Sequence, residues 1–251
     1  MIDVGAIYFD LDDTLCGYWD ACKHGLRETF TQHGPDGHDV DDLIRHWAAA
    51  FREFLPTVKQ EGWYSLYCKK GEPTRTEQMR LTLLRLGIED SALASRLSQA
   101  YLDARHDHLE LFDGALEVLN ALKPRYPLGL ITNGPADIQR MEIAILGIDS
   151  YFQHFFIEGE LGFGKPDEEV FHLAEAAVGL PPEKLLFVGN SYAHDIRPAI
   201  EAGWKTAWIR RPSDVSPSAG PGPSKPEEMP DGAPKPDAEI TELKQLLALL
   251  P

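Results

Sequence analysis

The sequence is poor in cysteine and in positive charge. It contains three cysteines, Cys16, Cys22 and Cys68, and their spacings fit neither a zinc site nor a redox pair. The simplest interpretation is a reducing context, so we expect a cytoplasmic protein. The 24 basic side chains are outnumbered by 40 acidic ones, which gives a formal net charge of -16. This charge argues against a nucleic-acid polymer or an anionic membrane as the main partner, but a local cation can still bind a small anionic substrate.

Long apolar stretches are also absent. No window is long enough to span a bilayer, and the N-terminus lacks the basic region and apolar segment of a signal peptide. We therefore expect a soluble intracellular protein. The 251 residues, 43% of them hydrophobic, are enough for one large domain or two modest domains with a sizeable core.

Short apolar runs are present, and the first of them ends in carboxylates. Residues 4–9 are apolar and of strand length, and Asp10 and Asp12 follow. Such a run is typical of a strand buried on both faces of a parallel sheet. In these sheets ligands bind beyond the carboxyl ends of the strands, and side chains two residues apart point to the same side. Asp10 and Asp12 could therefore face one pocket, although an ordinary turn would explain the same residues.

The periodicity divides the chain into two regions. Between residues 19 and 102, apolar side chains recur at helical spacing in four stretches, with Gly and Pro between them. Between residues 112 and 209, helical and strand patterns alternate, which predicts an α/β fold with a parallel, doubly wound sheet.

We therefore expect a Rossmann-like core and a second, helical unit. The core comprises residues 1–16 and 110–251, and residues 17–109 form a cap inserted after the first strand. Residues 213–236 are dense in Pro, Ser and Gly, so we expect a flexible excursion within the core.

Polar side chains lie at the predicted strand ends or in the loops that follow them. They are Asp10 with Asp12, Thr132 with Asn133, Lys165, and Asn190 with Asp195. Because the carboxyl ends of parallel strands share one edge of the sheet, we expect these side chains to gather there. Together they offer a nucleophile, a second carboxyl, a hydroxyl, an ammonium group and metal ligands.

The order of these residues resembles the haloacid dehalogenase-like hydrolase superfamily. The resemblance rests on Asp10-x-Asp12-x-Thr14, Thr132, Gly164-Lys165-Pro166, and Gly189-Asn190-Ser191 followed by Asp195. It covers nearly the whole chain outside residues 213–236, and the helical insertion resembles that superfamily's cap domain. Thr132-Asn133-Gly134 with Gln139-Arg140, together with Gly164-Lys165-Pro166, is similar to the capped phosphatase branch that contains pyrimidine nucleotidases and the acylneuraminate phosphatase.

The resemblance implies a Mg²⁺-dependent phosphatase that acts on a small phosphorylated metabolite through an aspartyl-phosphate. Asp10 would attack phosphorus, and Asp12 would protonate the leaving oxygen and then activate water. The metal would be held by Asp10, the backbone carbonyl of Asp12, Asn190 and Asp195. Asn190 departs from the family, which usually has Asp there, and this lowers the expected metal affinity. Asp195 could alternatively cap its helix.

The resemblance also implies a phosphate-binding group. Thr132, with Asn133 and Gly134, would donate hydrogen bonds to phosphoryl oxygens. Lys165 would neutralise phosphoryl charge and keep Asp10 ionised. The alternatives are a threonine that caps the next helix and an exposed loop lysine.

The cap would close over the pocket and exclude water. Candidates for substrate contact within it are Trp19, Trp63, Tyr64, Tyr67, Lys69, Lys70 and Arg75. Most of the aromatic side chains are expected to belong to the core of the cap.

Three other functions remain open. A 2-haloacid dehalogenase uses an aspartate nucleophile without needing a metal or a leaving-group acid, and Asp12 argues against it. A phosphomutase shares the first step with a phosphatase. A non-catalytic protein that binds a phosphorylated ligand would explain the loss of an acidic metal ligand at Asn190.

Overall fold

Within the described residues, six parallel strands form one sheet. The structure is a computed structural model that describes residues 1–60, 62–212, 215–219 and 227–251. The strand order is β3-β2-β1-β4-β5-β6, and every neighbouring pair is parallel. The strands are β1 (Ala6–Phe9), β2 (Leu128–Thr132), β3 (His154–Ile157), β4 (Leu185–Gly189), β5 (Lys205–Ile209) and β6 (Ala238–Ile240). The predicted doubly wound parallel sheet is confirmed.

β1 is first in sequence but lies inside the sheet, between β2 and β4. The chain adds β2 and β3 on one side of β1 and then returns to add β4, β5 and β6 on the other. Such a reversal of strand order is the place where ligands bind in open α/β sheets. Phe9, the last residue of β1, is in register with Leu130 and Val188. The residues after Phe9 therefore emerge at the middle of the sheet edge.

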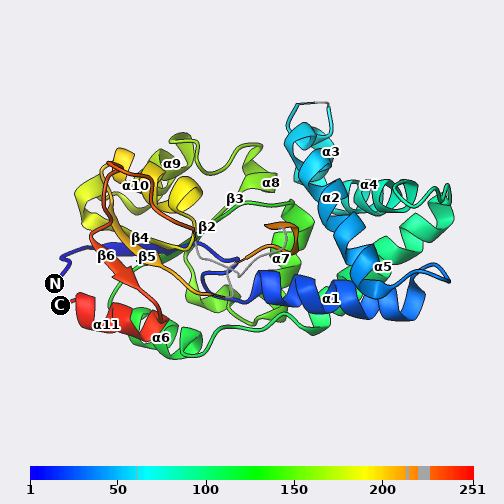
Figure 1. Cartoon of the computed structure of the whole chain (residues 1–251). Coiled ribbons are helices and arrows are strands. Elements are labelled where there is room, and N and C mark those ends of the chain that lie inside the picture. Colours follow the sequence, from blue (N-terminus) through cyan, green and yellow to red (C-terminus); the bar gives the residue numbers. More distant parts are fainter. Residues whose placement is uncertain (61, 213–214, 220–226) are drawn as a thin grey trace.

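Helices cover both faces of the sheet, because alternate side chains of a strand point to opposite sides. Ile7 and Phe9 pack in a core with α6 (Ala115–Leu122) and α11 (Leu246–Leu249). Ala6 and Tyr8 pack in a core with α9 (Glu169–Val178) and α10 (Arg197–Glu201). Figure 1 shows these two pairs of helices on opposite sides of the sheet. Two further helices of this region are α7 (Ala136–Ile145) and α8 (Glu158–Leu161).

Between β1 and β2 the chain forms a group of helices that we call the helical insertion. Its helices are α1 (Tyr18–His33), α2 (Val40–Val58), α3 (Tyr64–Lys69), α4 (Glu72–Leu84) and α5 (Ser91–Asp107). α1, α2, α4 and α5 bury their apolar faces in a common hydrophobic cluster, which explains the four predicted stretches, and α3 was not predicted. Figure 1 shows the insertion beside the sheet. Its status as a separate, hinged domain stays a prediction.

The predicted flexible excursion, residues 213–236, falls partly outside the described residues, namely at 213–214 and 220–226. Its described parts contact the rest of the protein. Arg52 Nη1, on α2, donates to the carbonyl oxygen of Ser218 at 2.6 Å, and Glu227 Oε2 accepts from the N–H of Tyr192 at 2.6 Å. The flexibility of the segment stays a prediction.

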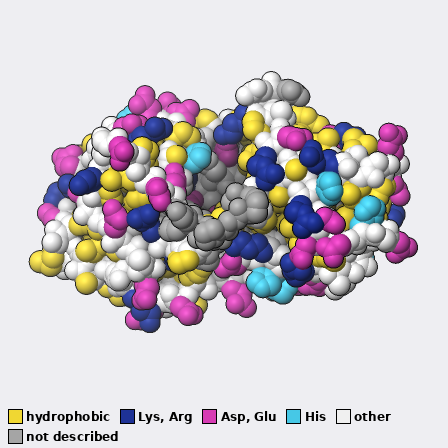
Figure 2. Space-filling model, viewed as in Figure 1, with side chains coloured by type: hydrophobic (Ala, Val, Ile, Leu, Met, Phe, Trp, Pro, Cys, Tyr) yellow, Lys and Arg dark blue, Asp and Glu magenta, His cyan; other side chains and the backbone are white. Residues whose placement is uncertain are grey.

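The structure also bears on the expectations about membrane-spanning segments and about the cysteines. Among the described residues, none of the helices has the length and apolar composition needed to cross a bilayer. All three cysteines are buried and form no disulfide. On the face shown in Figure 2, basic side chains lie among acidic ones over both the sheet region and the insertion.

Candidate active site

The loop that follows β1 is held in one conformation by several contacts. Asp13 has a left-handed backbone with φ of 59°, and its Oδ1 accepts from the N–H of Trp19 at 3.0 Å. Arg211, which follows β5, donates to the backbone carbonyl oxygens of Asp13 at 2.8 Å and Thr14 at 3.2 Å. These contacts fix the backbone that carries Asp10 and Asp12. Sequence reasoning missed Arg211, because an arginine far along the chain carries no signal of this contact.

Asp10, Lys165 and Asp195 form a buried cluster at the carboxyl ends of β1 and β4. Lys165 Nζ lies 2.7 Å from Asp10 Oδ1 and 2.6 Å from Asp195 Oδ1, and the lysine is only 2% exposed. Asp195 Oδ2 accepts from the N–H of Ser191 at 2.9 Å. A β-carbon at Gly189 would lie 2.5 Å from Asp195 Oδ2, so glycine is needed there. The structure therefore brings these predicted residues together, and Lys165 is not an exposed loop lysine.

The contacts within this cluster shift the pKa values of Asp10 and Lys165. Burial raises the pKa of Asp10 to about 7, and Asp195 and Asp12 add to the rise while Lys165 limits it. Burial alone would lower the pKa of Lys165, but the carboxylates of Asp10 and Asp195 more than offset this, so its pKa is raised. Lys165 thus stays a cation inside the protein and favours the ionised form of Asp10.

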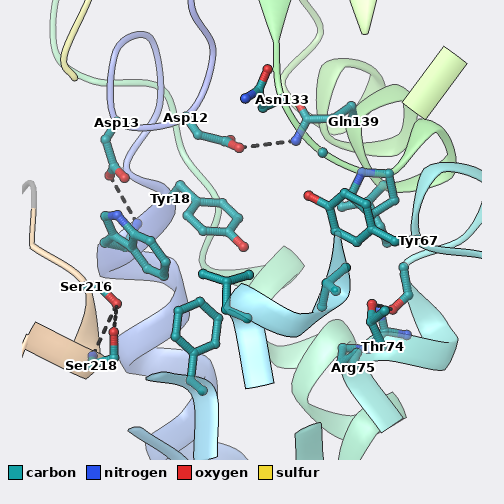
Figure 3. A pocket seen from close by; sticks show the side chains of 18 of the residues that line it. Asp12, Asp13, Tyr18, Tyr67, Thr74, Arg75, Asn133, Gln139, Ser216 and Ser218 are labelled. Carbon is teal, nitrogen blue, oxygen red and sulfur yellow. Dashed lines mark hydrogen bonds between the residues drawn. The ribbon is translucent and has the colours of Figure 1, made fainter. Parts of the chain in front are cut away.

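Asp12 lies in a second polar network, of which Figure 3 shows the hydrogen bond between Gln139 and Asp12. Gln139 Nε2 donates to Asp12 Oδ2 and to Glu142 Oε2, both at 3.1 Å. Glu142 is fully buried and pairs with Arg105 of the insertion, Nη2 to Oε1, at 2.7 Å. Burial, with a contribution from Glu142, raises the pKa of Asp12 to about 8, although Arg105 opposes the rise. A carboxyl with this pKa can carry a proton near neutral pH.

Thr132 and Gly134 have protein partners at positions where the sequence predicted phosphate donors. The Thr132 hydroxyl donates to Gln139 Oε1 at 2.7 Å. The N–H of Gly134 donates to Glu158 Oε2 at 3.1 Å. Both groups lie at the end of β2, as expected, but each would have to exchange its partner to bind a phosphoryl oxygen. Thr132 does not cap α7, since the N-cap residue is Pro135 and no side chain caps that helix.

Asn133 joins β2 to the lysine loop. Its Nδ2 donates to the backbone carbonyl oxygen of Lys165 at 2.7 Å, and its Oδ1 is buried without a hydrogen-bond partner among the described residues. The side chain lines the cavity described below. Asn133 therefore keeps one acceptor for a ligand.

The side chains predicted to bind a metal differ in the partners they already have. The Thr14 hydroxyl lies 3.3 Å from Asp10 Oδ2 and 3.2 Å from Asn190 Oδ1, so both oxygens contact the same hydroxyl group. Asp195 is instead occupied by Lys165 and a backbone N–H. Among the described residues there is no group of three or more His, Cys, Asp or Glu side chains suited to a metal. Asp10 and Asn190 nevertheless fit Mg²⁺, which prefers oxygen ligands and keeps several waters.

A cavity of about 520 Å³ lies between the sheet edge and the insertion. On the sheet side it is lined by Asp10, Asp12, Asn133, Gly134, Gln139, Lys165, Asn190 and Asp195, among others. Of the predicted contacts in the insertion, Trp19, Tyr67 and Arg75 line the cavity. Trp63, Tyr64, Lys69 and Lys70 are not among the described residues that line it. In Figure 3, Asp12 and Gln139 lie toward one end of the view, Arg75 lies toward the other, and Tyr67 lies between them.

Sequence reasoning also missed the role of Gln139, Glu142 and Arg105. Gln139 and Glu142 lie three residues apart on one face of α7, which starts just after the polar end of β2. That placement was the available signal for Gln139. The pairing of Glu142 with Arg105 depends on how the insertion packs on α7 and has no local signal.

A family model of haloacid dehalogenase-like hydrolases matches residues 4–203. The chain belongs to this family. A phosphoserine phosphatase from Thermus thermophilus is 32% identical over 240 residues, which cover 90% of this chain and 93% of the relative. The family assignment made from the sequence motifs is thus confirmed, and the protein is a hydrolase.

The predicted branch is also represented among the relatives. Mouse N-acylneuraminate-9-phosphatase is 26% identical over 223 residues, which cover 88% of each chain. The pyrimidine 5'-nucleotidase YjjG from Escherichia coli is 29% identical over 140 residues, which cover 53% of this chain and 60% of the relative. This haloacid dehalogenase-like hydrolase therefore resembles capped phosphatases, as the motifs after β2 predicted.

Solved structures share the fold over nearly the whole chain. The putative hydrolase YfnB from Bacillus subtilis, solved with magnesium, matches with a TM-score of 0.72, 21% identity and coverage of 98% of each chain. A 2-haloacid dehalogenase from Pseudomonas syringae matches with a TM-score of 0.65 and 26% identity, covering 98% of this chain and 97% of the other. The fold thus occurs both in a putative hydrolase solved with magnesium and in a dehalogenase.

Proposed function

We propose that this hydrolase is a Mg²⁺-dependent phosphatase that hydrolyses a small soluble phosphomonoester through an aspartyl-phosphate on Asp10. One observation carries the proposal: two carboxyls two residues apart have different environments. Asp10 is paired with a buried ammonium group at 2.7 Å, whereas Asp12 accepts a hydrogen bond from the neutral amide of Gln139 at 3.1 Å. Two carboxyls with such different partners are suited to different roles in catalysis.

In the first step Asp10 attacks phosphorus and the bond to the leaving oxygen breaks, while Asp12 gives its proton to that oxygen. In the second step Asp12, now ionised, takes a proton from water as the water attacks phosphorus. This releases inorganic phosphate and restores the Asp10 carboxylate. Lys165 offsets the negative charge of the phosphoryl group throughout.

Asp10 and Asn190 would hold Mg²⁺, and the backbone carbonyl of Asp12 stays a predicted third ligand. When bound, the ion would supply positive charge that reduces the repulsion between Asp10 and an anionic phosphate. Asp195 would act on Lys165 by holding its ammonium group against Asp10, as the 2.6 Å contact supports.

The phosphate donors predicted after β2 require a change of partner. Thr132 would turn from Gln139, and Gly134 from Glu158, when a phosphoryl group enters. Asn133 would position the lysine loop through its bond to the backbone of Lys165. The insertion would act as the cap that excludes water, with residues 17–109 as its predicted limits.

The proposed substrate is a small phosphorylated metabolite, as the names of the phosphatase relatives support. The cytoplasmic location and the absence of nucleic-acid and membrane partners stay predictions. The three unpaired cysteines support the location.

The test is release of phosphate from p-nitrophenyl phosphate with and without Mg²⁺. We expect turnover only with the ion, and we expect Asp10→Asn to lose it, whereas Asp20→Asn, a matched change beside the partly exposed Lys23, keeps it. Equal turnover by Asp10→Asn and the wild type would reject Asp10 as the nucleophile.

A 2-haloacid dehalogenase is the second candidate. The dehalogenase from Pseudomonas syringae, which has the same fold, and the neutral Asn190 favour it. Halide release from 2-chloropropionate without added metal, together with no phosphate release, would support it over the phosphatase.

A further inference from the structure

The insertion lines part of the cavity with side chains that the proposed chemistry does not use. They are mostly aromatic and include Trp19, Trp47, Phe51, Phe54 and Tyr67. Trp47 and Phe51 stack with ring centroids 5.1 Å apart, and Trp19 meets Phe51 edge-on at 6.3 Å. Aromatic walls favour a flat, apolar ligand body, because such a body can pack against a whole ring face.

We call the part of the cavity lining that comes from the insertion the aromatic wall. Two buried polar groups in this wall lack hydrogen-bond partners among the described residues. Gln78 is 5% exposed, and its Nε2 donates to the carbonyl oxygen of Trp47 at 2.9 Å, which leaves Oε1 as an unpaired acceptor. The indole Nε1 of Trp47, a residue 3% exposed, is an unpaired donor. Both side chains line the cavity. Because an unpaired buried polar group is destabilising, these two groups are ready for partners that a ligand brings.

The charge of this wall is positive. The charged side chains that the described part of the insertion contributes to the cavity are Arg75 and Arg105. Arg105 is neutralised by Glu142 at 2.7 Å. Arg75 donates through Nε to the carbonyl and hydroxyl oxygens of Ser98 and forms no ion pair within the described residues. A free ammonium group, such as that of an amino-acid phosphate, would find no carboxylate on this wall.

We propose that the insertion binds the alcohol part of the phosphomonoester, and that this part carries a planar heteroaromatic ring with hydrogen-bond donors and acceptors on its edge, as a nucleobase does. The proposal rests on the proposed phosphatase function, with the phosphoryl group at Asp10. The ring packs on the aromatic walls, and an N–H on its edge donates to Gln78 Oε1. Its carbonyl oxygens accept from Trp47 Nε1 and from Arg75. A cavity of about 520 Å³ is of the size that takes such a ligand.

Four phosphomonoesters separate the contribution of the flat ring from that of the hydrogen-bonding groups on its edge. Uridine 5'-monophosphate has a flat ring and these edge groups, whereas glycerol 1-phosphate has neither. The compound 5,6-dihydrouridine 5'-monophosphate keeps the edge groups without a flat ring, and phenyl phosphate keeps a flat ring without the edge groups. We expect kcat/KM to be about tenfold or more higher for uridine 5'-monophosphate than for any of the others. An equal or higher value for glycerol 1-phosphate would overturn the proposal.

Gln78→Met tests the edge contact, because it removes the acceptor and keeps the length of the side chain. We expect the ratio of kcat/KM for uridine 5'-monophosphate to that for phenyl phosphate to fall about tenfold. Gln99→Met, the same change at an exposed site on α5, should leave this ratio unchanged. If Gln78 were only structural, Gln78→Met would lower both values alike, and an unchanged ratio would contradict the proposal.

Binding to the Asp10→Asn protein separates this inference from the proposed function. Calorimetry should show tighter binding of uridine 5'-monophosphate than of glycerol 1-phosphate, and adding Gln78→Met should remove most of the difference. Selective binding without turnover in the wild type would reject the proposed phosphatase activity and support the ring-binding site. Turnover of all four phosphomonoesters at similar rates, with no selective binding, would support the phosphatase activity and reject the ring-binding site.

Discussion

The sheet side and the insertion side of the cavity differ in how their polar groups are satisfied. At the sheet edge, Lys165 pairs with both Asp10 and Asp195 at 2.6–2.7 Å, so the positions of these side chains are fixed before any ligand enters. On the insertion, Gln78 and Trp47 keep unpaired groups within an aromatic wall. This difference teaches that Asp10, Lys165 and Asp195 are preorganised by their mutual contacts, whereas the groups proposed for recognition still lack partners.

Lys165→Met should give the largest effect on the sheet side. We expect phosphate release to fall about 10²–10³-fold, because the cation that offsets phosphoryl charge is gone. We also expect a loss of about 3–5 kcal/mol in the free energy of unfolding, because two buried carboxylates lose their partner. Phosphate release and urea unfolding measure the two effects. Lys184→Met, at an exposed pair with Asp3, is the matched control.

A second change separates chemistry from stability at this position. Adding Asp195→Asn to Lys165→Met removes one of the unpaired charges and should recover part of the stability but none of the activity. Recovery of both would mean that Lys165 has only a structural role.

Glu142→Gln tests the connection between the two sides. Its partner Arg105, 6% exposed in its side chain, would be left buried without a counter-charge, so we expect a loss of about 3–5 kcal/mol in the free energy of unfolding. Glu160→Gln breaks a pair with Arg140 that is 36–44% exposed and should cost less than about 1 kcal/mol. Similar losses in urea unfolding for the two variants would show that the buried pair does not join the insertion to α7 as described.

Asn190→Asp sharpens the account of the metal. An added carboxylate beside Asp10 should lower the Mg²⁺ concentration needed for half-maximal activity by about tenfold, because ligand charge tunes affinity. Asn120→Asp, at a surface site that accepts from Tyr151, is the control. An activation curve unchanged by Asn190→Asp would place the ion away from Asn190.

The smallest expected effect concerns pH and the insertion. Burial, followed by the charges of Arg105 and Arg75, lowers the pKa of His106 from 6.5 to about 4. Between these values the unfolded chain binds a proton that the folded chain does not, so this residue's contribution to stability falls as the pH drops through that window. In His106→Gln, the free energy of unfolding measured with urea should fall less between pH 6.5 and 4 than in the wild type. His38→Gln, at an exposed site, should not change this fall. An equal fall with pH in both variants would refute the role of His106.

The fold was predictable because its signals are local. The apolar run of β1 and that of β4 have strand length and are buried, and the residues that follow each of them are polar. The alternation of helices with such runs fixes a parallel sheet, and the sheet then gathers Asp10, Lys165 and Asp195 at one edge. The short helix α3 was missed, since six residues are too few to display a helical period.

The surroundings of the site were not predictable, because they depend on tertiary packing. Nothing near Glu142 in sequence indicates that Arg105 will neutralise it. Likewise, the sequence places Thr132 at a strand end but does not show that its hydroxyl donates to Gln139. Polar side chains on a helix are usually exposed, so their burial becomes visible only in the assembled structure.

The most direct test of the central claim is to trap the phosphoryl group on the protein. Wild-type protein would be mixed with Mg²⁺ and a radiolabelled phosphomonoester, quenched in acid within one turnover, and digested for peptide mapping. The account predicts label on the peptide that contains Asp10, and its loss in Asp10→Asn. Turnover with no label on the protein, or with label on another residue, would contradict it.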